Sequence, residues 1–352
     1  ASGNPLGLLI EEARTNGLLR SELIGSTSWM SAAVLISQDA TTAPDGSNTA
    51  TSLISTAATG EHFTQQAGTN TAATETFSVY AKPNGFNYLF LRTNLDSSWL
   101  TGYASFNVAT GELGVVGPSI DSTTITYAGN GWYRCSMTFD NRNGAVAQLH
   151  AKPTDTASSA STGDGVNGLY LWGAQVETGA FPTSYIPTSG STVTRAADFA
   201  SLPVERFAFN ATKGSVVVSV ETLMTSGSKG IVSIEGNSSA ENIGLFRGAN
   251  GNLVYEVRSG STTQAVFSVS PQVNTFKVAY VFANNYFNIA VNGVAQTSNT
   301  SGVVPTGLSA ILIGGVYTVG DQYRTNGHIK QIQYYPKRLS NTELQLLTQP
   351  SA

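Results

Sequence analysis

Hydrophobic residues recur at every second position over much of this chain. In TFSVYAKP (76–83), Phe77, Val79 and Ala81 alternate with polar or amphipathic residues. A period of two is typical of a strand that buries one face and leaves the other wet. The segments NYLFLRT, SFNVATG and GWYRCSMTF continue the pattern, each bounded by Gly, Asn or Pro. The first half of the chain therefore predicts an antiparallel β-sandwich.

The segment WYRCSMTF indicates which of its faces is buried. Tyr133, Cys135, Met137 and Phe139 fall on one side, and the more polar set that begins at Trp132 falls on the other. The first set is the better core face, so we expect Cys135 to be a small buried hydrophobe.

A second series of short alternating segments begins at GSVVVSVET (214–222). It continues through KGIVSIEG, IGLFRG, NLVYEVRSG, FKVAYVFANNYFNIAVNG, SAILIGG and GHIKQIQYYP. Asn292-Gly293 after alternating apolar residues is a strong hairpin signal. The final segment, RLSNTELQLLTQ, instead predicts a short helix capped by Ser340 or Asn341, which we expect to pack against the last strand. The fold class predicted is all-β, with two antiparallel jelly-roll sandwiches in tandem and a short C-terminal helix.

Residues 170–198, YLWGAQVETGAFPTSYIPTSGSTVTRAAD, interrupt the alternation with glycines and prolines. We interpret this stretch as the end of one domain and the crossing to the next, with Pro182 and Pro187 stiffening an extended strap. The predicted organisation is an N-terminal segment with a docking role (1–28), a first jelly roll (29–180), a proline-pinned linker strap (181–205) and a second jelly roll (206–352).

Composition supports this organisation and excludes several classes of partner. The 352 residues favour two domains, and the low charged fraction of 11% with 36 glycines favours strands and turns over helices. A net charge of −4 gives no basic field for nucleic acid. The single cysteine excludes an intrachain disulfide. No apolar run approaches the roughly 18 residues of a membrane span, and no signal segment is found, so we expect synthesis in the cytoplasm without a signal peptide.

Catalytic constellations are not found in the sequence. His62, His150 and His328 lack metal-ligand spacing and are interpreted as polar surface or satisfied core residues. The acidic residues never occupy alternate positions on one strand, as a glycan hydrolase of this class would need. Arg20-Ser21-Glu22-Leu23 and Gln148-Leu149-His150 resemble two motifs of jelly-roll alginate lyases, but the third motif, which supplies a tyrosine, is missing. We therefore expect a protein that is not an enzyme.

Sugar recognition needs exposed aromatic faces with polar groups beside them. Aromatic and basic residues in loop-like surroundings are the candidates for carbohydrate binding, and each aromatic has the alternative of covering an end of a sandwich: Trp99, Tyr103, Trp29, Arg247, Tyr323 and Arg324. No cofactor or metal ligand is assigned; Ca²⁺ would need oxygen ligands, and no spacing of aspartates singles one out.

Three strings of the first half resemble a region of tailed-bacteriophage virion proteins in which a carbohydrate-binding-module-like jelly roll is joined to a second domain. They are LLIEEARTN (8–16), GNGWYRCSMTF (129–139) and the stretch 170–200. The second half, with GSVVVSVE, FNIAVNG, ILIGG and GHIKQIQYYPKRLSNTELQLLT, resembles the laminin-G/concanavalin-A-like jelly roll found downstream in such proteins. Together the matches span nearly the whole chain.

The resemblance implies a structural protein on the virion surface, such as a fibre, spike or capsid decoration of the head, neck or tail. Its implied partners are other virion proteins and host or environmental glycans, through which it would serve host attachment. Phage appendages are commonly trimers, so a homo-oligomer is implied, although no heptad or other trimerising repeat occurs. Two alternatives stay open: a cement or fibre subunit without sugar binding, and a polysaccharide depolymerase.

Overall fold

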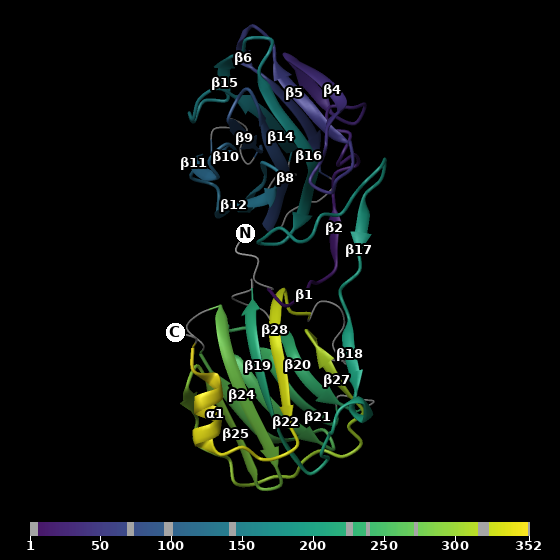
Figure 1. Ribbon diagram of the computed structural model, residues 1–352, viewed down its shortest axis with the longest axis vertical. Helices are drawn as coiled ribbons and strands as arrows, with labels where there is room; N and C mark the ends of the chain where they lie inside the picture. The colour runs from purple at the N-terminus through teal and green to yellow at the C-terminus, as the bar shows by residue number, and fades with distance from the viewer. Residues whose placement is uncertain are drawn as a thin grey trace. The chain divides into compact units, whose positions relative to one another are not determined.

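The computed structural model describes residues 6–68, 74–94, 101–140, 146–222, 228–236, 240–270, 274–315 and 324–350. The chain forms two compact units. The first unit is Arg14–Arg195, and the second combines the chain up to Ala13 with Ala196–Ala352. Each unit is an antiparallel β-sandwich of two six-stranded sheets (Figure 1). The predicted all-β class with a short C-terminal helix is confirmed.

The first unit contains two facing sheets, which we call sheet 1 and sheet 2. Sheet 1 has the order β11 (Glu112–Val116), β10 (Tyr103–Asn107), β9 (Tyr88–Arg92), β14 (Val146–Lys152), β7 (Phe63–Ala67), β3 (Met30–Ala32). Sheet 2 has the order β12 (Ser122–Gly129), β13 (Trp132–Asp140), β8 (Thr74–Asn84), β16 (Gly168–Thr178), β5 (Ala50–Ser55), β4 (Val34–Thr41). A small ribbon, β6 (Thr59–Glu61) with β15 (Ala160–Thr162), lies beside them.

The core of the first unit lies between sheets 1 and 2. Phe77 from β8, Leu91 from β9 and Phe106 from β10 are fully buried in it. Cys135 is also fully buried there, as predicted, and burial raises the pKa of its thiol well above the ordinary value. The thiol therefore stays protonated and unreactive.

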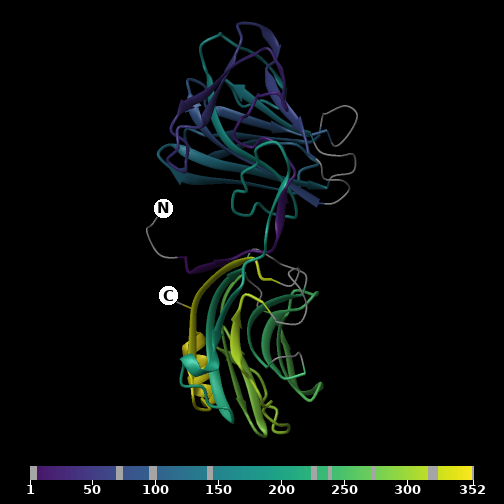
Figure 2. The same ribbon diagram turned by 90° about the vertical axis from the view of Figure 1, so that its right-hand side faces the viewer.

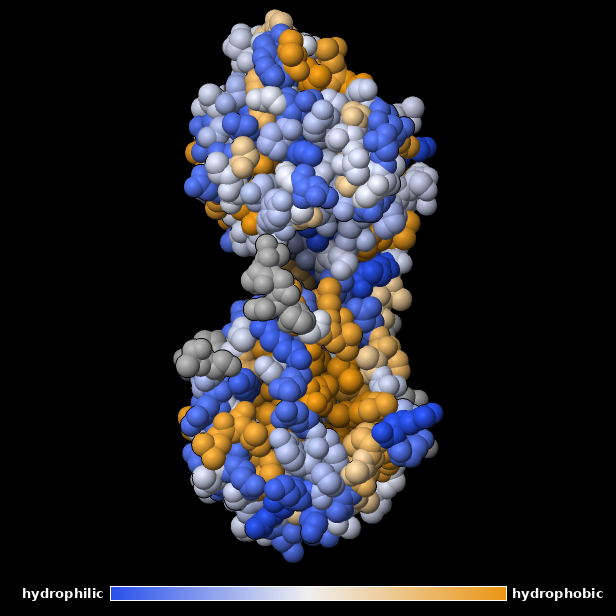
Figure 3. Space-filling view, viewed as in Figure 1, coloured by the Kyte–Doolittle hydropathy of each residue, from blue (hydrophilic) through white to orange (hydrophobic). Residues whose placement is uncertain are grey.

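The second unit contains sheets 3 and 4, which Figure 2 shows as two layers. Sheet 3 has the order β1 (Leu8–Ile10), β28 (Gly327–Tyr335), β19 (Lys213–Thr222), β24 (Thr275–Ala283), β25 (Tyr286–Val291), β26 (Val294–Ala295). Sheet 4 has the order β18 (Ala200–Pro203), β27 (Ala310–Ile313), β20 (Lys229–Glu235), β21 (Asn242–Arg247), β22 (Leu253–Ser259), β23 (Thr262–Val269). Figure 3 shows apolar surface gathered on part of the second unit. Phe207 and Tyr334 are partly buried and pack against the core of this unit, with their ring centroids 5.1 Å apart.

The C-terminal helix, α1 (Asn341–Thr348), starts as the sequence predicts. Ser340 caps it and forms a capping box with Glu343, so two backbone N–H groups at the helix start are satisfied. Its position corrects the prediction, since α1 packs over β24 and β25 rather than over the last strand, β28. Its buried Leu344 contacts an apolar patch on the outer face of sheet 3. Among the described residues, no helix has both the length and the apolar character to cross a membrane.

The predicted domain boundaries differ from the division seen in the structure. The N-terminal segment 1–28 is divided at residue 13, because β1 joins sheet 3 while β2 (Arg14–Asn16) pairs with β17 (Val193–Arg195) in the first unit (Figure 1). The strap 181–205 is divided at residue 195, because β18 pairs with β27 in sheet 4. Backbone pairing with distant strands therefore assigns both segments to the sandwiches themselves.

The strap residues of the first unit pack on the outer side of sheet 2. Tyr185 lies against Trp172, with ring centroids 4.5 Å apart, and Ile186 is buried. Glu177 of β16 accepts hydrogen bonds of 2.6 Å from both the backbone N–H and the hydroxyl of Thr183. These contacts make the strap a fixed part of the first unit.

Two buried tyrosines of the second unit give a matched prediction. The hydroxyl of Tyr255 donates to the carbonyl of Val281 at 2.9 Å, whereas the fully buried hydroxyl of Tyr280 has no partner. An unpaired buried hydroxyl costs about 1–3 kcal/mol, and a satisfied one contributes about 1 kcal/mol. We expect Tyr280→Phe to raise the free energy of unfolding by about 1 kcal/mol and Tyr255→Phe to lower it by about 1 kcal/mol in urea titrations. A loss of stability in Tyr280→Phe would contradict this assignment.

Candidate functional site

The outer face of sheet 1 carries large polar side chains on its central strands. On β14 the residues at 147, 149 and 151 enter the core, so alternation directs Gln148, His150 and Lys152 to the outer side. The register places Arg92 beside Gln148 and Phe90 beside His150. We call this surface the polar face, and its residues are Glu61, Phe63, Gln65, Tyr88, Phe90, Arg92, Tyr103, Ser105, Asn107, Gln148, His150 and Lys152.

A chain of hydrogen bonds orders the centre of the polar face. Nε2 of His150 lies 2.8 Å from Oε1 of Gln148, and Nε2 of Gln148 donates to Oε1 of Gln65 at 2.7 Å. Because an amide oxygen only accepts, the proton of His150 is on Nε2. Burial lowers the pKa of His150 well below its ordinary value, and the charges of Arg92 and Lys152 act in the same direction. The imidazole is therefore neutral, and its buried Nδ1 has no hydrogen-bond partner.

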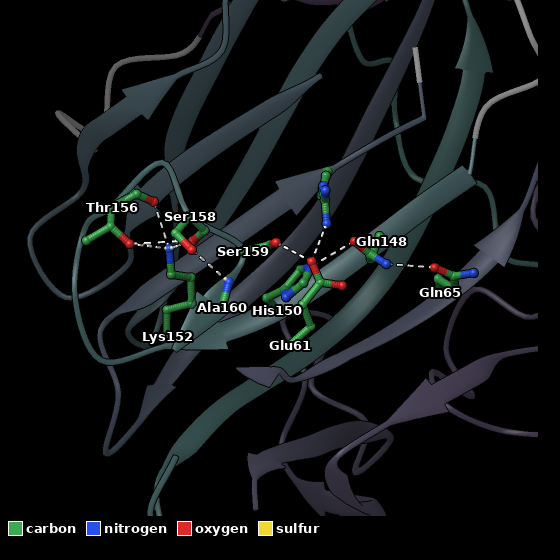
Figure 4. A network of polar contacts seen from close by, with 10 residues as sticks. Glu61, Gln65, Gln148, His150, Lys152, Thr156, Ser158, Ser159 and Ala160 are labelled. Atoms are coloured by element: carbon green, nitrogen blue, oxygen red, sulfur yellow. Dashed lines mark hydrogen bonds and ion pairs between the residues drawn. The ribbon is translucent and has the colours of Figure 1, made fainter. Parts of the chain in front are cut away.

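An ion pair lies beside this chain. Arg92 donates from Nη1 to Oε1 of Glu61 at 2.8 Å, and the hydroxyl of Ser159 donates to the same oxygen (Figure 4). Burial raises the pKa of Glu61, but the hydrogen bonds from Ser159 and Arg92 and the charge of Arg92 outweigh it and leave the pKa below its ordinary value. Glu61 therefore presents a carboxylate whose side chain is 41% exposed.

Lys152 lies at the other end of the network shown in Figure 4. Its ammonium donates to the carbonyl and hydroxyl oxygens of Thr156 and to the carbonyl of Ser158, at 2.6–2.9 Å. It also lies 4.4 Å from the ring centroid of Phe90. Burial lowers the pKa of Lys152 to about 8, although the charge of Asp155 acts against this. The three donors of the ammonium match three oxygens, so Lys152 fixes the loop after β14 against the sheet.

Aromatic rings border the polar groups. The ring of Tyr103 stacks on Phe90 with centroids 5.4 Å apart and an interplanar angle of 18°. Tyr103, Tyr88 and Phe63 are half-buried, whereas Phe90 is fully buried. The polar face thus has two layers. A buried layer of Phe90, Gln148, His150 and Lys152 fixes an accessible layer of rings, amide and carboxylate.

The predicted aromatic candidates of the first unit have different outcomes. Tyr103 lies on the polar face. Trp29 is only 6% exposed, belongs to the core and donates from Nε1 to the carbonyl of Arg20, so the prediction of an exposed platform at Trp29 is wrong. Trp99 lies outside the described residues, as does Tyr323 of the second unit.

Arg247 and Arg324 belong to the second unit and are not loop side chains open to solvent. They are 6% and 8% exposed, respectively. Arg247 donates from Nε to the carbonyl of Gly251 at 3.0 Å, and Arg324 lies over the ring of Phe199 at 4.9 Å. Their burial removes the accessibility that the prediction required, and both belong to a different unit from Tyr103.

Sequence reasoning missed most of the polar face. The segment AVAQLHAK (145–152) alternates small apolar residues with Gln148, His150 and Lys152, which are larger and more polar than the Ser and Thr of other strands. That contrast was the available signal. The interpretation of the histidines holds for His62, whose ring nitrogens lie 2.7 and 3.0 Å from the carbonyls of Ala33 and Ala58. His150 is buried as well, and its Nε2 lies in the ordered network of the polar face.

Metal binding finds no support in the described part of the chain. No group of three or more His, Cys, Asp or Glu side chains there is placed to hold an ion. On the polar face, Glu61, Gln148 and Lys152 make their hydrogen bonds with protein donors and acceptors.

Comparison with known proteins gives fold-level similarity only. No family model matches the chain, and no curated protein matches it. Among solved structures, the Ruminococcus gnavus IT-sialidase CBM40 is similar with a TM-score of 0.35 and 20% identity, over 40% of this chain and 84% of that one. The NanB sialidase of Streptococcus pneumoniae gives 0.36 and 14%, over 42% of this chain and 26% of that one. A heptameric SAP-like pentraxin of Limulus polyphemus gives 0.31 and 11%, over 40% and 72%. At such values the similarities carry no conclusion about function.

Proposed function

We propose that the protein binds glycans and that the polar face of the first unit is its binding surface. The observation that carries the proposal is the two-layer arrangement, in which accessible rings and polar groups are held by a buried network. A sheet face with no binding role needs neither a neutral buried histidine nor a buried lysine, because Ser and Thr satisfy an exposed strand face at lower cost.

The chemistry of the accessible layer suits a sugar ring. The half-buried rings of Tyr103 and Tyr88 have apolar faces and a polar hydroxyl at one edge. A pyranose likewise has apolar C–H groups on its faces and hydroxyl groups around its edge, so the two can stack. The carboxylate of Glu61 accepts hydrogen bonds from hydroxyl groups, and the amide of Gln65 both donates and accepts. Because Gln148 fixes Gln65 and Arg92 fixes Glu61, these groups lose little conformational entropy when a ligand binds.

The proposed role is binding without catalysis. A glycoside hydrolase needs two carboxyl groups about 5–9.5 Å apart, one of them free to act as an acid. Among the described residues of the polar face, one has a carboxyl group, Glu61. Its hydrogen bonds with Arg92 and Ser159 keep this group in its charged form. The tripeptide Gln148-Leu149-His150 resembles a lyase motif, but the lone pair on Nδ1 of His150, which could act as a base, is buried beneath the surface.

We further propose that this binding serves a structural protein displayed on a phage particle. The support is the resemblance of segments 8–16, 129–139 and 170–200 to virion proteins. Several copies on one particle would raise the effective concentration of weak sites, so poor single-site affinity would be sufficient for attachment. Immunogold labelling of purified particles with antibodies to this chain tests the setting; particles without label would contradict it.

Binding is tested by a glycan array followed by calorimetry on the best hit. We expect Tyr103→Ala to weaken affinity at least tenfold, about 1.4 kcal/mol, because one of the accessible rings of the binding surface is removed. Tyr127→Ala is the matched control, because Tyr127 is a 49% exposed tyrosine on β12 of sheet 2, and its affinity should equal that of the parent protein.

The other possible results of this experiment favour one of the two alternative functions. Equal losses in the two variants, or binding to no glycan at all, would overturn the proposal and favour a cement or fibre subunit. Release of reducing ends from host polysaccharide would instead favour a depolymerase.

A further inference from the structure

A groove with a volume of about 360 Å³ opens on the first unit, beside β4, the edge strand of sheet 2 (Figure 1). Four segments line it: the chain after β2 with Glu22 and Leu23, β4 with Asp39, the start of β5 with Thr49 just before it, and the strap with residues 187–189. The volume is within the range of about 300–1,000 Å³ that small-molecule sites occupy.

Two aromatic side chains fix polar groups in the wall of this groove. Nε1 of Trp172 on β16 donates to Oγ1 of Thr49 at 2.9 Å. The hydroxyl of Tyr185 on the strap donates to Oε1 of Glu22 at 3.1 Å. Trp172 is only 4% exposed and packs against Tyr185 on the outer side of sheet 2. Because the two rings are packed in place, the hydroxyl of Thr49 and the carboxylate of Glu22 have fixed positions before a ligand binds.

Asp39 is placed in the lining by an irregularity of β4. The pairing of β4 with β5 shifts between Ser37 and Thr41, and Asp39 has a φ of 55°. Few residues other than glycine adopt this left-handed conformation, although Asp and Asn do so more readily than most. Among the described residues, the exposed carboxylate of Asp39 has no hydrogen-bond or ion-pair partner.

The groove presents acceptors beside apolar surface. Glu22 uses one carboxylate oxygen for Tyr185, which leaves its Oε2 for a ligand, and Asp39 adds two more carboxylate oxygens. Leu23 and Pro187 are exposed and contribute apolar surface to the lining. The described lining has no cationic side chain. A matching ligand therefore brings several O–H donors and an apolar side, and it has no negative charge.

We propose that this groove is a second binding site, specific for an uncharged saccharide with adjacent hydroxyl groups. The two oxygens of a carboxylate accept charge-assisted hydrogen bonds from two neighbouring hydroxyls. The C–H groups of the sugar then pack against Leu23 and Pro187. An acidic saccharide is disfavoured, because its anion would meet two carboxylates in a lining whose described residues offer it no cation.

The groove and the polar face lie on opposite sides of the first unit. The polar face is the outer face of sheet 1, whereas the groove lies with the strap on the outer side of sheet 2. The two sites share no residue, so the groove does not depend on the polar face. One unit with both sites would hold two saccharide segments at once, and binding to a glycan-coated surface would gain from both.

The test compares the full chain with its Tyr103→Ala variant on an array of uncharged and acidic saccharides. Calorimetry then follows the uncharged saccharide that both proteins bind equally well. We expect Glu22→Gln and Asp39→Asn each to weaken this binding about threefold and the double variant to weaken it at least tenfold. Both substitutions keep the shape of the side chain, and asparagine adopts a φ of 55° as readily as aspartate, so the fold is retained.

Asp121→Asn is the matched control, because Asp121 is an exposed aspartate next to β12, at the opposite edge of sheet 2, and its substitution removes the same charge. Its affinity should equal that of the parent protein, and a loss as large as that of Asp39→Asn would overturn the proposal. An array without an uncharged saccharide that Tyr103→Ala still binds fully would also overturn it, as would a preference for acidic saccharides in that variant. Signals that Tyr103→Ala weakens belong to the polar face, so failure of one site is distinguished from failure of the other.

Discussion

Replacing Asn16 by alanine is expected to lower the free energy of unfolding of the first unit by about 4 kcal/mol or more. The Asn16 side chain is fully buried and makes four hydrogen bonds. Its Nδ2 donates to the carbonyls of Ala174 and Ile186 at 3.2 and 2.9 Å. Its Oδ1 accepts from the backbone N–H groups of Leu18 and Val176 at 3.1 and 3.2 Å. Alanine would leave all four backbone groups buried without this partner, each at a cost of about 1–3 kcal/mol.

The effect of this substitution is large because Asn16 joins three segments that are distant in sequence. It holds the segment after β2, the strand β16 and the strap at Ile186 against one another. Asn48→Ala is the control, since Asn48 makes an exposed hydrogen bond to the carbonyl of Asp39 and should change stability by less than about 0.5 kcal/mol. Urea unfolding followed by tryptophan fluorescence measures both variants. A loss below about 1 kcal/mol in Asn16→Ala would mean that water satisfies the four groups.

Period-two alternation was sufficient to predict the class of fold. In β13 the core residues Cys135, Met137 and Phe139 are those that the pattern selects, because a buried strand face must be apolar whatever the sheet order. The Asn292-Gly293 turn has φ angles of 46° and 84°, as the hairpin signal requires. These features are local, so the sequence nearby contains the whole signal.

Two short strands near the start of the chain could not be assigned in this way. Leu8–Ile10 and Arg14–Asn16 are short strands, and their partners lie in β28 and β17, hundreds of residues away for the first and nearly two hundred for the second. Three-residue strands have no periodicity to detect. The role of Asn16 is likewise invisible in sequence, because a buried asparagine is recognised only by the backbone groups that tertiary structure brings to it.

The candidate site was found only in part for a related reason. Tyr103 was selected because an aromatic residue near turn formers suggests exposure, and it does lie on the polar face. Trp29 has the same local context, yet its indole is buried in the core of the first unit. Arg92 and Gln148 become neighbours only through the pairing of β9 with β14, and no local pattern specifies that pairing. Polar residues at alternate positions predict that their side chains point outward. They do not predict which other strands lie beside that strand in the sheet.

The buried layer of the polar face predicts strongly non-additive substitutions. Gln148→Leu alone removes the acceptor of His150 Nε2 and the donor to Gln65, and we expect it to cost about 2 kcal/mol of unfolding free energy. His150→Phe alone leaves Oε1 of Gln148 without its donor and should cost about 1 kcal/mol, since it also removes the unpaired Nδ1. The double variant replaces the pair by apolar groups of similar shape between Phe63 and Phe90. It should unfold within about 1 kcal/mol of the parent protein, a coupling of roughly 2 kcal/mol.

The same double variant separates stability from binding. Without Gln148 the amide of Gln65 loses the hydrogen bond that orients it, so glycan affinity should fall at least tenfold although the fold is as stable as before. Urea titration and calorimetry on one preparation measure both quantities. Additive stability losses would show that the two residues act independently. Full affinity in the double variant would contradict this role. The rings and Glu61 would then bind the sugar without an ordered amide beside them, and the buried layer would contribute to packing alone.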